Sequence, residues 1–141
     1  RELMTLARAD AEAFEAVLRA GRLPHGTTAE SAAREAALGD ANLEAARVPL
    51  RTAEACHNVL RLAVLAARSG NPNAVTDAGT AGLLARAGAE AALLNVEINL
   101  KSLPASADKA GVEKSLQRLR ASLDASSGEC LAAVRSALDA S

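Results

Sequence analysis

Apolar and polar residues alternate along most of the chain with the period of an α-helix. Residues 2–18 predict a first amphipathic helix, which Gly21 and Pro24 bring to an end. Its apolar side carries Leu3, Leu6, Phe14, Val17 and Leu18.

The second helix is predicted to be long, running from residue 29 to residue 69 behind a cap at Thr27 or Thr28. Pro49 lies inside it and cannot donate a backbone hydrogen bond, so we expect a kink near residues 45–48 rather than two separate helices. Residues 69–73 read Ser-Gly-Asn-Pro-Asn, a strong turn signal.

The third helix is predicted to start between Asn73 and Thr76 and to run to about Leu103, before Pro104. Residues at helical spacing along it are Leu83, Leu84, Ala87, Ala91, Leu94 and Ile98. Residues 94–100 also alternate as a half-buried strand would. We favour the helix because nothing nearby offers a partner strand.

A fourth helix is predicted over residues 108–139. Its nearly heptad seam consists of Val112, Leu116, Leu119, Leu123, Cys130, Val134 and Leu138. The pattern therefore predicts an all-α fold, a bundle of about four main helices in a single domain spanning residues 1–141.

Composition agrees with close helix packing. Half of the 141 residues are hydrophobic, much of this alanine, and Phe14 is the only aromatic residue. The net charge of −1 and the lack of a basic cluster beside aromatic residues argue against a nucleic-acid partner. No apolar run reaches membrane-spanning length and no secretion signal is visible, so we expect no membrane partner and a cytoplasmic location.

Cysteine and histidine give little indication of chemistry. Cys56 and Cys130 are far apart in sequence, and we expect buried thiols rather than a disulfide. Cys56 and His57 point about 100° apart on a helix, so they do not form a nucleophile pair, and a structural role for His57 is favoured. His25 lies in a loop. The sequence holds no HExxH motif or cysteine cluster, so no metal site is predicted.

The most informative stretch is the turn before the third helix. Asp77 is expected in the first helical turn, where the helix dipole favours a carboxylate. It is either a helix-capping residue or a catalytic acid/base with Asn71, Asn73 and Thr76 as hydrogen-bonding, substrate-binding neighbours.

Asn95 and Asn99 follow on the third helix at i and i+4. They form either an interhelical hydrogen-bonding pair, a solvated face, or a polar wall that binds the edge of a heterocyclic substrate. The glycines at positions 79, 82 and 88 have no preceding strand, so close helix packing explains them better than a phosphate loop.

Several segments, in this order and at this spacing, resemble the formiminotransferase-cyclodeaminase and methenyltetrahydrofolate cyclohydrolase family. The segments that carry the resemblance are Asp10 with Phe14, Leu23-Pro24, residues 45–50 (Ala-Ala-Arg-Val-Pro-Leu), Cys56, Gly70-Asn71, Thr76-Asp77 and residues 95–100 (Asn-Val-Glu-Ile-Asn-Leu).

The resemblance implies an all-helical enzyme of one-carbon metabolism that acts on tetrahydrofolate derivatives and assembles as a homodimer or larger oligomer. One branch of the family closes 5-formiminotetrahydrofolate with release of ammonia, and the other hydrolyses 5,10-methenyltetrahydrofolate to 10-formyltetrahydrofolate. It also implies that Asp77 is the catalytic acid/base. The folate is a substrate, and no permanently bound cofactor is expected.

Three points stay open at this level. The sequence does not separate deaminase from hydrolase. A non-catalytic helical oligomerisation or interaction module is the alternative function. The chain starts at Arg1 within helical sequence, and the Pro-Gly-Gly-Gly-Ser segment of the family is not present, so we expect the domain to be N-terminally incomplete.

Overall fold

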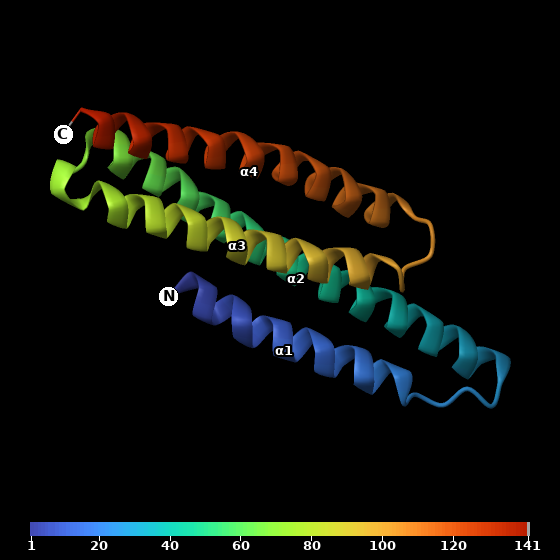
Figure 1. Ribbon diagram of the computed structural model, residues 1–141. Helices are drawn as coiled ribbons and strands as arrows, with labels where there is room; N and C mark the ends of the chain where they lie inside the picture. Colours follow the sequence, from blue (N-terminus) through green and yellow to red (C-terminus); the bar gives the residue numbers. More distant parts are fainter. Residues whose placement is uncertain (141) are drawn as a thin grey trace.

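Four α-helices and one short 3₁₀ turn make up the protein, in a computed structural model that describes residues 1–140 (Figure 1). The elements are α1 (Glu2–Gly21), α2 (Thr28–Ser69), the 3₁₀ turn η1 (Pro72–Ala74), α3 (Val75–Leu100) and α4 (Ala107–Asp139). No strand occurs among these residues, so the predicted all-α fold is confirmed and residues 94–100 are helical.

The long helix α2 organises the bundle. It contacts α1, α3 and α4, while α3 also packs against α4. In Figure 1, α2 lies behind α3, with α4 along one edge and α1 along the other. Most of the core lies between α2, α3 and α4, around the fully buried Leu60, Leu93 and Leu123. A small separate cluster of Ala13, Ala45 and Val48 attaches α1 to α2.

The start of α2 follows from its sequence. Thr27 accepts a hydrogen bond from the Glu30 backbone N–H at 3.2 Å, and the Glu30 carboxylate accepts one from the Thr27 N–H at 2.9 Å. This reciprocal capping box satisfies two backbone donors that the first helical turn cannot use.

Pro49 lies inside α2, which continues through it as one helix; the kink stays a prediction. Because proline has no N–H, the carbonyl of Ala45, four residues earlier, loses its helical partner. The Asn99 side chain of α3 replaces it, donating from Nδ2 to the Ala45 oxygen at 2.6 Å. A side chain of α3 thus supplies the hydrogen bond that the Ala45 carbonyl of α2 lacks because of Pro49.

Glycines let α3 approach its neighbours closely. A methyl group at Gly82 would lie 2.7 Å from the Cys130 sulfur, and one at Gly79 would lie 3.2 Å from Val134. At Gly88 the nearest atom would be the Cys56 sulfur at 3.3 Å. The expected role of these glycines in close helix packing is confirmed.

Helices α3 and α4 are also joined along their polar edge. Arg86 pairs with Asp124 at 2.6 Å, and Arg120 pairs with Glu97 at 2.8 Å. Such partly exposed pairs contribute little stability each, but they show which flank of α3 is covered by α4.

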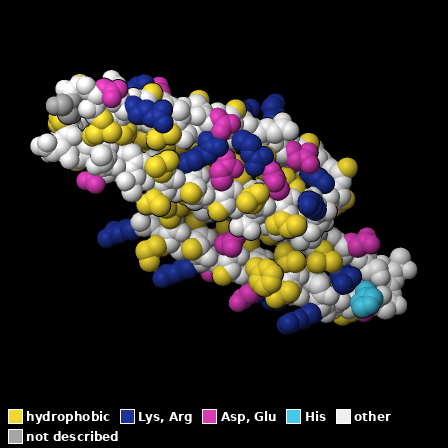
Figure 2. All heavy atoms as spheres, in the orientation of Figure 1, with side chains coloured by type: hydrophobic (Ala, Val, Ile, Leu, Met, Phe, Trp, Pro, Cys, Tyr) yellow, Lys and Arg dark blue, Asp and Glu magenta, His cyan; other side chains and the backbone are white. Residues whose placement is uncertain are grey.

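On α1 and α3, several large apolar residues that helical spacing suggested for the core are exposed. On α1 the buried residues are Ala13 and Ala20, whereas Phe14 is 62% exposed. On α3 the large residues at helical spacing point outward, and small residues such as Ala85 and Ala89 face the core. Small side chains allow the helices to approach each other closely, so they occupy many of the positions that face the core. Figure 2 shows the resulting apolar patches over α3 and α1.

The repair at Pro49 gives a first prediction. Asn99→Ala leaves the buried Ala45 carbonyl without a partner and should lower the free energy of unfolding by about 1–3 kcal/mol. In a Pro49→Ala background the new N–H at position 49 bonds that carbonyl, so the same change should cost much less. Urea denaturation of the four variants measures the coupling. Asn95→Ala, on the exposed side of α3, is the matched control, and equal losses in both backgrounds would contradict the interpretation.

Candidate functional site

The turn between α2 and α3 gathers four of the predicted site residues. The Asn71 side chain accepts a hydrogen bond from the Asn73 backbone N–H at 3.0 Å and caps η1. Thr76 accepts a bond from the Thr80 hydroxyl at its backbone oxygen, at 3.0 Å. All four residues, including Asp77, are exposed. The structure therefore brings Asn71, Asn73, Thr76 and Asp77 together at one end of the bundle.

Asp77 lies in the first turn of α3, as expected, and forms no ion pair with residues 1–140. The positive end of the helix dipole stabilises a carboxylate at this place. Its carboxylate is open to solvent and to any molecule that approaches the turn.

Asn95 and Asn99 lie on the same helix but well away from that turn. Asn95 is separated from Asp77 by eighteen residues, which corresponds to about 27 Å along the helix axis. Asn95 is exposed, and its amide makes only a long contact of 3.5 Å to the Ala91 oxygen. Asn99 is half-buried, with its amide committed to Ala45. One chain thus holds two groups of predicted site residues rather than one.

Asn95 borders a cavity between α1, α2 and α3. The volume of this cavity is about 210 Å³. Its polar residues are Asp10 of α1, Thr52 of α2 and Asn95 of α3. The apolar wall consists of Leu3, Leu6, Ala7, Pro49 and Ala92.

The cavity offers a carboxylate, a hydroxyl and an amide against an apolar surface. The Thr52 hydroxyl donates to the Val48 oxygen at 3.2 Å, which leaves its lone pairs available to a ligand. The Asn95 amide supplies a donor and an acceptor for the edge of a heterocycle. The volume suits the reacting end of a ligand, since complete small-molecule sites are usually about 300–1,000 Å³.

Asp10 and Thr52 are absent from the residues predicted for the site. Asp10 nevertheless belongs to the first-helix segment that carries the family resemblance, and this is the signal that could have identified it. Thr52 lies three residues after Pro49 and has no comparable signal, because only the packing of α1 against α2 reveals that it faces a cavity.

A larger groove of about 410 Å³ lies between α2 and α4 and contains none of the predicted site residues. The hydroxyl of Ser126, which lines this groove, lies 3.0 Å from the His57 ring nitrogen Nε2. Burial and the nearby charge of Arg61 lower the pKa of His57, opposed by a hydrogen bond to the Ser122 backbone. This contact between α2 and α4 is consistent with a structural histidine.

Both cysteines are free and buried, and burial raises the pKa of each thiol. Among residues 1–140, no group of three or more His, Cys, Asp or Glu side chains is placed to hold a metal ion. No helix in this part of the chain is both long and apolar enough to cross a membrane.

Comparison with known proteins gives consistent matches. The profile of the formiminotransferase-cyclodeaminase family matches residues 1–121. The chain is 42% identical to a methenyltetrahydrofolate cyclohydrolase from Methylorubrum extorquens over 84% of this chain and 56% of that protein. It is 36% identical to a formimidoyltransferase-cyclodeaminase from Sus scrofa over 84% of this chain and 22% of that protein. The chain therefore spans about half the length of the first relative and about a fifth of the second.

The fold and the cavity define an all-helical domain with a small, partly polar cavity between its helices. The family match covers most of the chain, and both relatives named above exceed 30% identity over most of it. The chain belongs to the formiminotransferase-cyclodeaminase family.

The lowered pKa of His57 predicts how stability depends on pH. The unfolded chain binds a proton at this ring near pH 6.5, and the folded chain binds it only at lower pH. This contribution to stability is complete above about pH 6.5 and is lost as the pH falls through the folded-state pKa. His57→Gln should flatten the stability profile between pH 7 and pH 5, measured by urea denaturation. His25→Gln, in the exposed α1–α2 loop, should leave the profile unchanged.

Proposed function

We propose that the protein is a folate-dependent enzyme that hydrolyses 5,10-methenyltetrahydrofolate to 10-formyltetrahydrofolate. Cyclisation of 5-formiminotetrahydrofolate with release of ammonia is the second reaction of the same family. The relative with 42% identity is named as a methenyltetrahydrofolate cyclohydrolase, which favours hydrolysis. The comparisons do not favour the alternative of a non-catalytic helical module.

One observation carries the proposal. Three segments that resemble the family lie far apart in sequence, and they meet at one cavity through Asp10, Pro49 and Asn95. An interaction module would not need a carboxylate, an amide and a hydroxyl at a single hollow. A pterin needs such groups, because its edge presents both hydrogen-bond donors and acceptors.

The proposed hydrolysis requires one proton acceptor. A carboxylate takes a proton from water as the water oxygen adds to the carbon between N5 and N10. The bond from that carbon to N5 then breaks, the new hydroxyl group gives its proton to N5 as it becomes the formyl C=O on N10, and the carboxyl group releases the first proton to solvent. In the deaminase reaction, N10 attacks the formimino carbon and the carboxyl group instead donates a proton to the departing ammonia.

Asp77 remains the predicted catalytic residue, with Asn71, Asn73, Thr76, Asn95 and Asn99 as predicted substrate-binding residues. Their placement adds detail to this prediction. The hydrogen bond from Asn99 to Ala45 supports an indirect role, in which Asn99 holds the Pro49 wall of the cavity. Asn95 borders the cavity itself.

The proposal includes a homodimer and a cytoplasmic location. Large apolar side chains on α1 and α3 remain exposed in the single chain, which supports a second copy as partner. Two free, buried thiols are typical of a reducing compartment. The folate is a substrate, and no resident cofactor or metal is proposed.

Ligand binding tests the function directly. A reduced folate at about a hundred times its Kd should add roughly 2.7 kcal/mol to the free energy of unfolding of the complete gene product. A thermal-shift series with 5,10-methenyltetrahydrofolate and 5-formyltetrahydrofolate measures this gain. p-Aminobenzoylglutamate, which lacks the pterin, is the control. No shift with any reduced folate would favour the interaction module.

Substitution tests the predicted catalytic residue. Asp77→Asn in the complete gene product should reduce kcat by about 10²-fold or more with folding intact, because the proton acceptor is lost. Asn71→Ala and Asn95→Ala should mainly raise KM. Asp40→Asn, an exposed aspartate on α2, is the matched control. Normal turnover by Asp77→Asn would reduce Asp77 to a helix-stabilising residue.

A further inference from the structure

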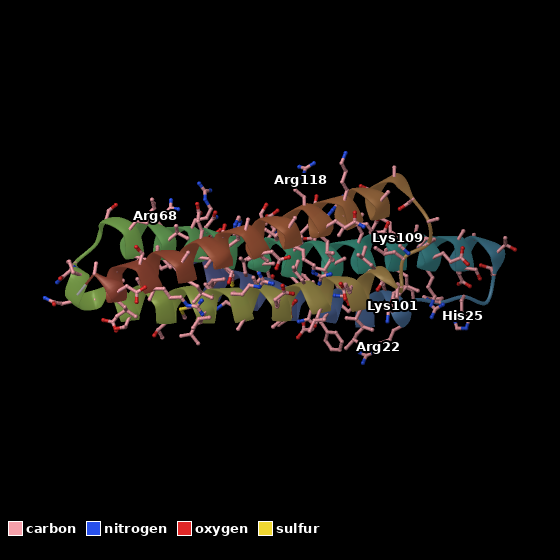
Figure 3. All side chains as sticks on the ribbon, turned by 45° about the horizontal axis from the view of Figure 1, so that its top comes forward. Arg22, His25, Arg68, Lys101, Lys109 and Arg118 are labelled. Carbon is pink, nitrogen blue, oxygen red and sulfur yellow. The ribbon has the colours of Figure 1, made fainter. Side chains whose placement is uncertain are left out.

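The cavity between α1, α2 and α3 contains a carboxylate that the proposed reaction does not use. Asp10 contributes it from α1, and it has no hydrogen bond or ion pair among residues 1–140. Figure 3 shows Arg22 and Lys101 where α1 and α3 end. Arg22 follows Asp10 by twelve residues, about 18 Å along the helix axis, which is too far for the two to pair. The Asp10 carboxylate is therefore available to a ligand.

Each of the three helices contributes to the cavity in the same way, with an apolar residue followed three positions later by a polar one. These pairs are Ala7 and Asp10 in α1, Pro49 and Thr52 in α2, and Ala92 and Asn95 in α3. Helices α1 and α3 run in the same direction in Figure 1, whereas α2 runs against them. Asp10 and Asn95 therefore lie toward one end of the cavity, and Thr52 lies toward the other.

The end of the cavity with Asp10 and Asn95 combines two hydrogen-bond acceptors with a donor. The two carboxylate oxygens of Asp10 can accept two parallel N–H groups, as a carboxylate does from a guanidinium group. The Asn95 Nδ2 group makes only the 3.5 Å contact to the Ala91 oxygen, so it can donate to a ligand. The matching ligand is a flat group that carries two adjacent N–H donors followed by a carbonyl oxygen.

A 2-amino-4-oxopyrimidine ring has this order of groups along one edge. Its 2-amino group and its N3–H are adjacent donors, and O4 is the acceptor beside them. The pterin of a reduced folate contains this ring. The flat faces of the ring can pack against Leu3, Leu6 and Pro49 of the cavity wall. Phe14, the only aromatic residue, does not line the cavity, so this packing is aliphatic.

We propose that Asp10 selects the pterin by accepting hydrogen bonds from its 2-amino and N3–H groups, while Asn95 donates to O4. This inference rests on the proposed function, because it assigns the part of the folate that the cavity holds. The reacting carbon between N5 and N10 is attached to the second ring of the pterin, away from the 2-amino group. Asp10 is thus a specificity-determining residue and takes no part in proton transfer.

Binding of 5-formyltetrahydrofolate to the complete gene product tests the role of Asp10. Asp10→Asn replaces one acceptor oxygen with an NH₂ group that faces a donor of the ligand, so the Kd should rise on the order of 10²-fold. The ligand is an anion, and loss of a carboxylate would by charge alone strengthen binding. Isothermal titration calorimetry measures the Kd. Glu12→Gln, exposed on α1 outside the cavity, is the charge-matched control, and an unchanged Kd for Asp10→Asn would overturn the proposal.

A change in the ligand identifies the hydrogen bond itself. The 2-deamino-2-methyl analogue of 5-formyltetrahydrofolate keeps the shape of the ring and lacks the 2-amino donors. The original protein should bind this analogue about 10- to 100-fold more weakly, because one carboxylate oxygen then lacks its partner. Asp10→Asn should discriminate much less between the two ligands, since the same bond is already lost. Equal discrimination by both proteins would show that Asp10 does not contact the 2-amino group.

Turnover separates recognition from catalysis. Asp10→Asn should raise the KM for 5,10-methenyltetrahydrofolate and leave kcat within about threefold of the original value. A large fall in kcat at unchanged KM would make Asp10 a proton-transfer group and overturn its role in selection. Failure of the original protein to bind any reduced folate would refute the proposed function and this inference together. Folate binding that does not depend on Asp10 would refute this inference alone.

Discussion

The hydrogen bond from Asn99 to the Ala45 carbonyl is the contact on which the arrangement of this protein depends. Helix α2 packs against the three other long helices, and Pro49 lies in its middle. Without a replacement donor, the proline would leave a buried carbonyl unpaired at a cost of about 1–3 kcal/mol. The donor comes from the last turn of α3, so the same contact fixes how α3 lies along α2. The cavity wall at Pro49 and the position of Asn95 follow from it.

Much of the fold could be predicted because its signals are local. The capping box at Thr27 and Glu30, the proline at 49, and the Asn71–Asn73 turn each act within a few residues. The side of α3 that faces the core could not be predicted in this way. This helix is apolar almost all round, so periodicity identifies a helix without orienting it. Packing decided the orientation, because Gly79, Gly82 and Ala89 allow a closeness that leucine prevents.

The candidate site could likewise be predicted where its signals are local, but not where tertiary packing decides. Asp77 was placed correctly at the start of a helix, and the Asn71 turn was found from its residue types. The residue pattern did not indicate how far Asp77 lies from Asn95. Asp77 and Asn95 lie eighteen residues apart on one helix, so no rotation of side chains can join them within a chain. Asp10 approaches Asn95 only because α1 folds back along α2, a tertiary relation that a local pattern does not contain.

The absence of side chains at Gly82 and Gly88 has a consequence for how the opening of this bundle can be observed. Each glycine covers a thiol, Cys130 from α4 and Cys56 from α2, so the two sulfurs lie against α3 from its two neighbouring helices. A thiol reagent reaches either sulfur only when α3 separates from the helix that carries it. The labelling rate of Cys130 therefore measures how often α3 separates from α4, and that of Cys56 measures how often α3 separates from α2. The ratio of the two rates shows which of these contacts opens more often. A native chain with no tryptophan or tyrosine, which gives little optical signal on unfolding, thus carries its own kinetic probes.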